Sequence, residues 1–266
     1  MLRVIISPAK KMLAGSDSFS ARDVPALSGR ARRLLSALAG MGADDLQRLW
    51  NVSDRLLPSC LDALAHLRRD GIPENVDELA DPAFSVRVSP AALAYVGIQY
   101  RSMAPSVMDE GQLAWLQAHL RIISGFYGCV RPFDAVLPYR LEMGARLAVD
   151  GSRDLYGFWG NAIAREVVRD GCGSVVNLAS VEYAKAVTPY LAGLGITCTT
   201  CIFGEAVRGG RPVQRSTASK TARGSMVRWM AEHGIERADD LPRFDVGYRI
   251  APELSPNPDT LVFMRA

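Results

Sequence analysis

Two kinds of spacing between apolar residues alternate along this chain of 266 residues. One is the short run of apolar and β-branched residues that is typical of a buried strand. The other is the three- and four-residue spacing of an amphipathic helix, which occurs over 29–69, 113–120 and 218–233. Because the two kinds are interspersed, the pattern predicts a mixed α/β fold in which helices flank a central mixed sheet. The strand-like runs are 2–6, 174–178, 196–203, 205–215, 244–250 and 260–264.

Two of these runs lead into similar polar turns. After 2–6, Ser7 and Pro8 suit the N-cap and first position of a helix, and after 174–178 a helix is expected to start near Ser180. Ligands of open sheets bind where strands end, because free backbone N–H groups and the positive ends of helices converge there. If both strands lie in one sheet, the turns bracket one anion, such as phosphate. The residues concerned are Ser7, Lys10, Asn177, Ser180, Glu182, Tyr183 and Lys185.

A second polar-rich stretch, 119–143, sets three arginines, an Asp and a Glu between apolar residues. Burying unpaired ions is costly, so these charges either pair with one another or are offered to a ligand. A third basic element is the helix over 218–233, where Lys220 and Arg223 project from one face. The expected phosphate contacts here are Arg121, Ser124, Arg131, Arg140, Lys220 and Arg223, with Tyr127 or Tyr139 stacking on a base.

Each of these interpretations has a plainer alternative. In the plainer reading of the two turns, Ser7 and Ser180 serve only as helix caps, with solvated lysines beside them. The charges of 119–143 would then form an internal ion-pair network that includes Asp134. Lys220 and Arg223 would lie on a solvated helix flank.

Composition indicates one compact domain over 1–266. The formal net charge is only +3, so attraction to a polyanion has to come from clustered Lys and Arg. No run is long enough to cross a bilayer, and the apolar start is too short for a secretory signal. The five cysteines lack the spacing of a disulfide framework, which favours a reducing, cytoplasmic compartment.

Cys198 and Cys201 resemble a metal or redox pair, but they stand in a β-branched run. Residues i and i+3 of a strand face opposite sides, so the two thiols cannot share a zinc ion. With three histidines and no second cysteine pair, the sequence predicts neither a metal site nor a cofactor.

Seven motifs in the same order resemble those of the YaaA family, proteins of the peroxide stress response that were formerly catalogued as uncharacterised. The resemblance covers essentially the whole chain, and Asn161 stands where relatives have Asp. It implies a cytosolic α/β protein with a family-specific fold, a positively charged cleft and a helix-hairpin-helix-like DNA-binding element, for which 123–130 is a candidate. It also implies a role in limiting oxidative DNA damage and free iron. The motifs are Ile6–Met12, Gly97–Tyr100, His119–Pro132, Pro138–Met143, Asp154–Gly160, Asn177–Tyr183 and Ala222–Arg228.

Two functions from different classes follow. In the first, the cations neutralise phosphates of bubble, junction or single-stranded DNA, or of a nucleotide-like anion, and binding depends strongly on salt. In the second, the protein is an enzyme that acts on a nucleobase, nucleoside or sugar phosphate, and makes or breaks an N-glycosidic bond. Glu142 or Glu182 would then supply acid or base, while Tyr139 and Asn177 orient the substrate. An effect on iron would be indirect, since the chain lacks clustered iron ligands.

Overall fold

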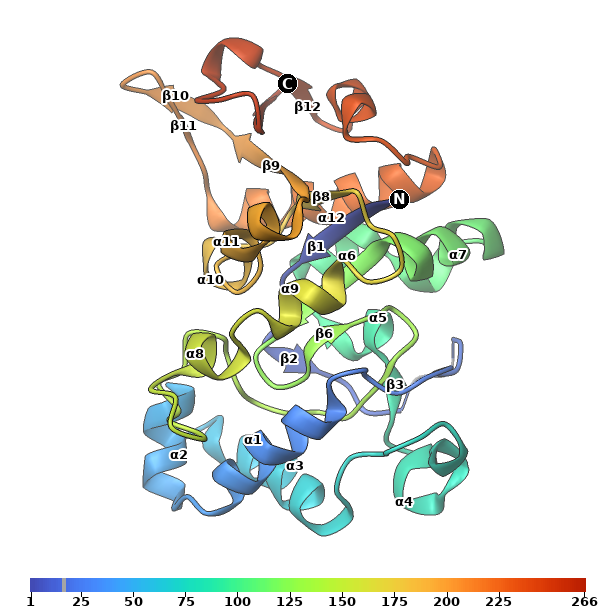
Figure 1. The fold of residues 1–266 in the computed structure, drawn as a ribbon, viewed down its shortest axis with the longest axis vertical. Helices are drawn as coiled ribbons and strands as arrows, with labels where there is room; N and C mark the ends of the chain where they lie inside the picture. Colours follow the sequence, from blue (N-terminus) through green and yellow to red (C-terminus); the bar gives the residue numbers. More distant parts are fainter. Residues whose placement is uncertain (16–17) are drawn as a thin grey trace.

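A seven-stranded mixed sheet forms the centre of the molecule in the computed structural model, which describes residues 1–15 and 18–266 (Figure 1). Its strand order is β12-β13-β9-β8-β1-β5-β6. The neighbours from β13 to β5 are parallel, and the outer strands β12 and β6 are antiparallel to theirs. The bounds are β1 (Leu2–Ile6), β5 (Leu120–Ser124), β6 (Gly128–Val130), β8 (Ser174–Asn177), β9 (Thr197–Gly204), β12 (Tyr248–Ile250) and β13 (Thr260–Arg265).

The parallel arrangement brings the ends of β1, β5 and β8 to one edge of the sheet. Ile6 of β1 is opposite Ile122 of β5, and Ile5 is opposite Asn177 at the end of β8. Every residue of β1 is buried, as expected for a central strand covered on both faces. The segments that follow these three strands therefore meet at one place, here called the carboxyl edge.

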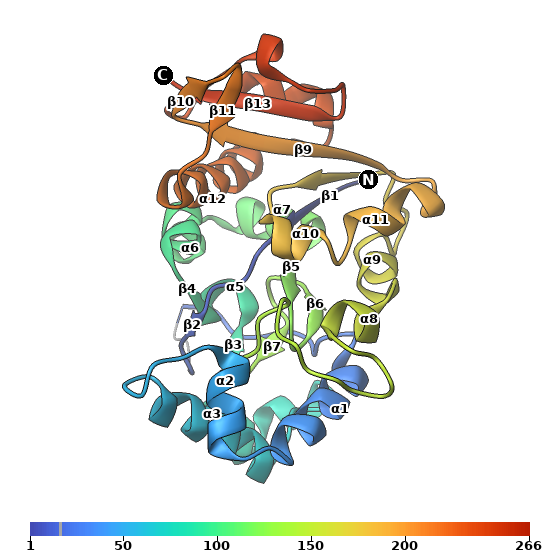
Figure 2. The same cartoon turned by 90° about the vertical axis from the view of Figure 1, so that its left-hand side faces the viewer.

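Helices cover both faces of the sheet. In Figure 1, α9, α10 and α11 lie in front of it, and α6, α7 and α12 lie behind it; Figure 2 shows the same two layers from the side. The start of α7 has a capping box, in which Asp109 and Gln112 exchange backbone and side-chain hydrogen bonds. The bounds are α6 (Ile98–Met103), α7 (Glu110–His119), α9 (Ala162–Val167), α10 (Val181–Ala184), α11 (Thr188–Leu191) and α12 (Ser216–Glu232).

Helices α12 and α6 cross at short range. A Cβ atom added at Gly224 would collide with the backbone carbonyl of Gln99. Only glycine allows this approach, so Gly224 fixes how α12 lies against α6.

A second group of helices and short strand pairs lies below the sheet in Figures 1 and 2. One contiguous cluster of buried side chains joins this group to the sheet, from Leu34 and Trp50 to Phe263. The helices are α1 (Ser28–Ala39), α2 (Ala43–Trp50), α3 (Leu57–Asp70), α4 (Pro82–Ser85), α5 (Ala91–Ala94) and α8 (Leu155–Trp159). The strand pairs are β2 (Lys11–Met12) with β4 (Tyr95–Val96), and β3 (Ser89–Pro90) with β7 (Ala135–Val136). A further hairpin of β10 (Ala206–Arg208) and β11 (Arg211–Val213) extends from the sheet at the top.

The predicted α/β class and most predicted elements are confirmed. The strand runs at 2–6, 174–178, 196–203 and 260–264 agree with the sheet to within two residues, and the helix over 218–233 begins two residues early as α12. The expected tight turn at Gly209 and Gly210 joins β10 to β11, with a positive φ at both glycines.

Three expectations about local structure are wrong. Ser7 does not begin a helix, because the chain after it extends into β2 and pairs with β4. Of the run 244–250, only 248–250 is a strand, and 244–247 is an irregular bend that follows the 3₁₀ helix over 238–243. The segment 123–130 is not part of a helix-hairpin-helix: it belongs to β5, β6 and their turn, and it is buried at every position. It therefore cannot present backbone N–H groups to a DNA phosphate.

No helix within the described residues is both long and apolar enough to span a membrane. In the same part of the chain, no three His, Cys, Asp or Glu side chains converge as a metal site requires. All five cysteines are free thiols.

Candidate functional site

The two polar turns expected to share an anion meet at the carboxyl edge. Ser180, at the start of α10, donates its backbone N–H to Ser7 Oγ at 2.8 Å, and the two hydroxyl oxygens lie 3.2 Å apart. Tyr100 of α6 donates its hydroxyl to the backbone carbonyl of Ser7 at 3.0 Å. Segments 173 residues apart in sequence are thus joined directly. Ser7 helps to anchor α10 and does not cap a helix of its own.

Asn177 connects the turn after β8 to the next strand, β9, by a hydrogen bond. Its Oδ1 accepts the backbone N–H of Ala179 at 3.0 Å, and its Nδ2 donates to Thr200 Oγ1 of β9 at 3.3 Å. Both polar atoms of the buried amide are therefore engaged. Asn177 shapes the turn after β8, and a ligand reaches it only by exchanging one of these bonds.

Ser124 and Tyr139 form a tyrosine-rich cluster behind the edge. Ser124 is fully buried, and its Oγ accepts backbone N–H groups from Phe126 and Tyr127. Tyr139 Oη lies 2.7 Å from Ser124 Oγ and 3.0 Å from Tyr95 Oη. Burial raises the pKa of Tyr139 to about 12, so its hydroxyl is protonated at neutral pH. Ser124 is not accessible to a phosphate, and the hydroxyl of Tyr139 is engaged with Ser124 and Tyr95.

A shared carboxylate links Lys10 to Arg140. Glu142 Oε2 lies 2.9 Å from Lys10 Nζ, and Glu142 Oε1 lies 2.8 Å from Arg140 Nη2. The Arg140 side chain is 13% exposed and that of Lys10 is 68% exposed, so only the lysine extends far into solvent. Tyr139, Leu141 and Tyr183 enclose a cavity of about 10 Å³ beside them, large enough for one water molecule.

Glu182 fastens α10 to the loop that carries Glu142. Its Oε1 accepts the backbone N–H of Gly144 at 2.8 Å, and its backbone carbonyl accepts the hydroxyl of Tyr156 at 3.0 Å. Lys185 Nζ lies 4.5 Å from the centre of the Tyr156 ring, which is the geometry of a cation–π contact. The second predicted carboxylate thus lies near the first.

Arg223 is a half-buried cation whose guanidinium has no hydrogen-bond partner among the described residues. It is half-buried on α12, and it forms no hydrogen bond or ion pair with any other residue that the structure describes. Burial lowers the pKa of its guanidinium, and its charge acts on the thiol of Cys201, the first residue of β9 beyond the end of β8. Lys220, one turn earlier on α12, is exposed. Arg223 therefore places an unpaired charge near the carboxyl edge.

Two predicted arginines lie elsewhere. Arg121 stands at the start of β5, at the opposite edge, and donates to the backbone carbonyls of Gln117, Ala118 and Leu120. Arg131 donates to Asp134 at 3.0 Å and to Asp23 at 2.6 Å. For Arg131 the internal ion-pair network is the correct interpretation. Both guanidinium groups thus have their partners away from the carboxyl edge.

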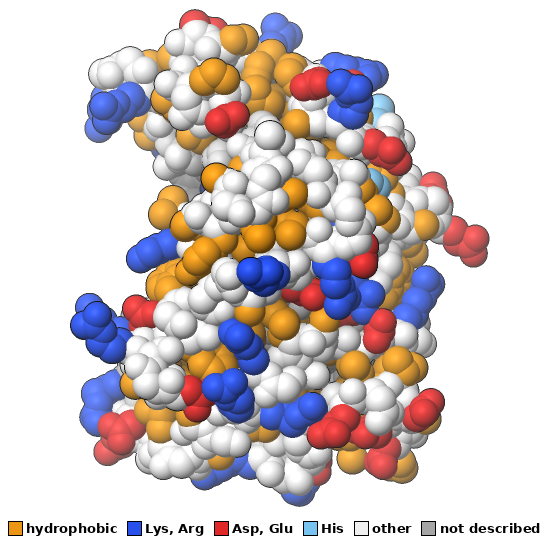
Figure 3. Space-filling view, in the orientation of Figure 1, with side chains coloured by type: hydrophobic (Ala, Val, Ile, Leu, Met, Phe, Trp, Pro, Cys, Tyr) orange, Lys and Arg blue, Asp and Glu red, His pale blue; other side chains and the backbone are white. Residues whose placement is uncertain are grey.

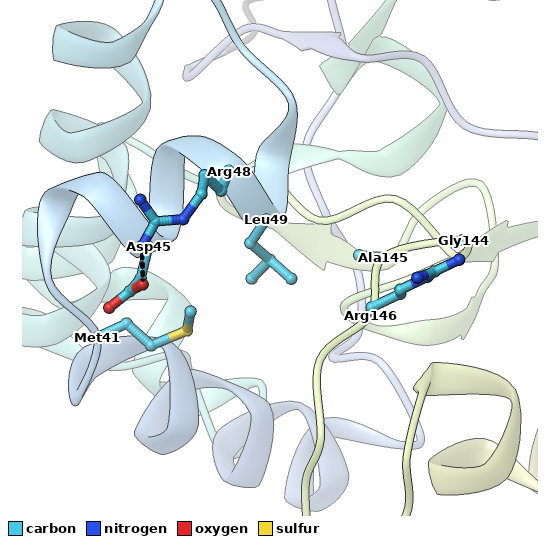
Figure 4. Close-up of a pocket in the computed structure, with 7 residues that line it drawn as sticks. All are labelled: Met41, Asp45, Arg48, Leu49, Gly144, Ala145 and Arg146. Carbon is cyan, nitrogen blue, oxygen red and sulfur yellow. Dashed lines mark hydrogen bonds and ion pairs between the residues drawn. The ribbon is translucent and has the colours of Figure 1, made fainter.

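A pocket that sequence reasoning did not find lies between α2 and the loop after Glu142, with a volume of about 390 Å³ (Figure 4). Arg146 extends from the loop on one side, and Arg48, paired with Asp45, stands on the other with Leu49 between them. Gly144 lines the pocket and also binds Glu182 through its N–H, so the pocket borders the carboxyl edge. Its residues come from segments about a hundred residues apart, and no local pattern marks them.

A family model described as "Peroxide stress protein YaaA" matches residues 2–254. The chain belongs to this family. Similar relatives are named UPF0246 protein: one from Pediococcus pentosaceus is 41% identical over 265 residues, covering 99% of this chain and 98% of the relative. One from Desulfitobacterium hafniense is 40% identical over 266 residues, covering 100% of this chain and 98% of the relative. One from Limosilactobacillus reuteri is 38% identical, with 98% of each chain covered.

The match to the YaaA family includes every segment of the carboxyl edge. Ser7, Tyr139, Ser180 and Arg223 all lie within residues 2–254. Asn161 occupies the N-cap position of α9 and makes no side-chain capping hydrogen bond. It therefore lies at the start of α9, outside the hydrogen bonds that join Ser7, Ser180 and Asn177.

Proposed function

We propose that this protein acts in the peroxide stress response, in the cytoplasm, by binding phosphate groups of DNA at the carboxyl edge. The DNA would be single-stranded or locally opened, as in a bubble or junction. The observation that carries this proposal is Arg223, which is half-buried and unpaired among the described residues. The Nε atom of Arg223 is fully buried, and a partly desolvated guanidinium without a carboxylate is costly in an empty site and favourable once a phosphate binds.

Further cations near the carboxyl edge favour a ligand with several phosphates, such as a DNA backbone, over a single anion. Lys220, Lys185 and Lys10 are exposed and come from α12, from the end of α10 and from the turn after β1. Figure 3 shows a hollow in the surface at its left border, below the β10–β11 hairpin and on the side of the carboxyl edge. The enclosed cavity at Lys10 is only about 10 Å³, so the edge suits an extended backbone better than a small ligand that needs enclosure.

The test measures binding to a bubble DNA by fluorescence anisotropy at a series of salt concentrations. Each phosphate contact releases condensed counterions, so Arg223→Gln and Lys220→Gln should each reduce the slope of log affinity against log salt by about 0.7. Arg237→Gln is the matched control, because Arg237 lies beyond the opposite end of α12 and pairs with Asp239. An affinity that stays flat as salt rises, or equal losses in all three variants, would contradict the proposal.

A second candidate function is an enzyme that acts on a nucleobase, nucleoside or sugar phosphate. It is favoured by Glu142 and Glu182, two carboxylates linked to the same loop near Tyr139. Glu142→Gln and Glu182→Gln separate the two functions. A DNA-binding surface should bind as well or more tightly with less negative charge, whereas an enzyme should lose turnover while it keeps ligand affinity.

A further inference from the structure

A large cavity lies on the other side of α12, apart from the carboxyl edge. Its volume is about 680 Å³, which is within the range of small-molecule sites. In Figure 2 the elements that surround it gather at the top of the molecule: the hairpin, the start of α12 and the C-terminal strands. Its polar and charged lining is Glu205, Arg215, Ser216, Thr217, Thr221, Ser225, Tyr248 and Arg265.

The N-terminal end of α12 opens into this cavity. Arg215 is the N-cap residue, and no side chain within the described residues caps the helix. The first backbone N–H groups, from Ser216 to Ala218, have no acceptor inside the helix and carry its positive partial charge. Ser216 and Thr217 both line the cavity, so these donors lie at its wall.

A row of hydroxyl groups continues from this helix end along one face. Thr217, Thr221 and Ser225 are spaced by four residues and all line the cavity. Arg223 is two residues from Thr221 and Ser225, about 200° around the helix, so it projects from the opposite face. One side of α12 therefore faces the cavity, and the opposite side carries Arg223 toward the carboxyl edge.

Tyr248 is an independent sign that the cavity receives a polar ligand. Its side chain lines the cavity, and the residue is only 7% exposed. Its hydroxyl forms no hydrogen bond with another residue of the described chain. The hydroxyl oxygen itself is not fully buried, so it is open to the cavity that the residue lines. A ligand acceptor in the cavity would supply a partner.

The charges around the cavity favour an anion. Arg265 Nη1 lies 2.6 Å from Glu205 Oε1, and Arg215 Nε lies 3.3 Å from Glu205 Oε2. One carboxylate thus faces two guanidinium groups, which leaves one positive charge in excess beside the positive end of α12. The Arg215 and Arg265 side chains are 78% and 63% exposed, so both are free to turn toward a ligand.

We propose that this cavity binds the phosphate group of a small phosphate monoester. The helix N–H groups, the two arginines and the hydroxyl of Tyr248 approach from different elements, which matches the tetrahedral oxygens of a phosphate better than a flat carboxylate. Val246, Ala218 and the Tyr248 ring supply an apolar wall for the body of the ester. This site is separate from the DNA-binding edge and does not depend on it.

The experiment measures binding of inorganic phosphate, phenyl phosphate and succinate by isothermal titration calorimetry at equal ionic strength. We expect phenyl phosphate to bind more tightly than phosphate, because its ring covers the apolar wall, and succinate to bind most weakly. Tyr248→Phe should weaken phosphate binding about tenfold, since hydrogen bonds to charged groups are the strong ones. Tyr190→Phe is the matched control, because Tyr190 lies on α11, away from the cavity lining.

Thr217→Val tests the site a second time with little risk to folding, because Thr217 is exposed in the first turn of α12, beside the free N–H groups, and its hydroxyl makes no hydrogen bond within the described chain. It should weaken phosphate binding several-fold and leave DNA binding unchanged. The proposal is overturned if the parent protein fails to bind phosphate and phenyl phosphate at about 10 mM, or if succinate binds as tightly. Equal affinities for Tyr248→Phe, Thr217→Val and the parent would overturn it as well.

Discussion

Two half-buried arginines, Arg131 and Arg223, show opposite arrangements of a charge inside this protein. Arg131 is surrounded by acceptors: Asp134 and Asp23 both bind its guanidinium, and Asp134 also accepts its backbone N–H at 2.8 Å. Arg223 has none of these partners among the described residues. Both residues are flanked by apolar neighbours in the sequence, so their neighbours alone do not distinguish them.

A buried cation indicates a binding role only where no acceptor within the protein pairs with it. The Arg131 cluster joins the segment at Asp23 to the turn before β7, so its charges hold two parts of the chain together. Arg223 holds nothing together through its charge. Its burial is a net cost to folding, which a bound anion would offset.

Removal of Arg131 should give the largest effect. Arg131→Met leaves Asp134, whose side chain is 2% exposed, without its counter-ion. Breaking a buried ion pair in this way typically destabilises a protein by about 3–5 kcal/mol. The free energy of unfolding in urea checks this expectation. The double variant Arg131→Met, Asp134→Leu should regain part of the loss, and a single variant as stable as the parent would show that the cluster has no structural role.

The pH dependence of stability should give the next largest effect. Burial raises the pKa of Asp134 from 3.8 to about 6, in spite of the opposing charge of Arg131. Because the folded-state pKa is above the unfolded one, the folded state holds its proton more firmly, and this contribution to stability is full below pH 3.8 and is lost as pH rises to 6. The expected loss is about 2 kcal/mol over that interval.

Urea unfolding at several pH values from 4 to 7 measures it. The slope that belongs to Asp134 is the difference between the parent and Asp134→Asn, because other carboxyl groups titrate in both proteins. Equal slopes in the two proteins would show that Asp134 is ionised across the whole interval.

Arg223→Met should have a small effect on stability and the opposite sign. Methionine keeps much of the arginine's apolar stem and removes an unpaired charge, so the free energy of unfolding should stay the same or rise by up to about 1 kcal/mol. The same variant should bind bubble DNA more weakly at low salt. A strong loss of stability would place Arg223 with Arg131 as a structural residue and remove the contrast between them.

The smallest effect is expected at the thiols near Arg223. Burial raises the pKa of Cys198 to about 11, and burial also raises that of Cys201 far above its usual value although Arg223 acts to lower it. Both thiols are therefore protonated and slow to react at neutral pH. Labelling with a thiol reagent at pH 7.5 should be as slow in Arg223→Met as in the parent. Fast labelling of Cys201 that depends on Arg223 would mean that this region is chemically reactive.

The sheet and its carboxyl edge could be predicted from the sequence because both depend on local patterns. The apolar runs at 2–6 and 174–178 are typical of parallel strands that are buried on both faces, and the serines after them mark where the strands end. That the two turns meet follows from the strands being neighbours. The pattern of residues suggested this contact, and the register of β1 with β8 determines it.

Other features could not be predicted, because they depend on distant partners. Arg121 follows the same kind of apolar neighbours as Arg131, but it stands at the start of β5, next to backbone carbonyls that are free at the end of α7. Ser7 and Pro8 suit a helix, yet pairing of the chain with β4 extends it. The cavity at Tyr248 draws its lining from residues between 205 and 265, and no spacing in the sequence brings these together.

The glycine at the crossing of α6 and α12 decides how ready Arg223 is for a ligand. Because any side chain at position 224 would collide with the carbonyl of Gln99, α12 is held in one rotational setting before anything binds. The orientation of its two faces is thus fixed during folding, and the entropy of ordering the helix is not lost a second time upon association. Gly224 touches neither ligand, yet a larger residue there would turn both binding faces at once.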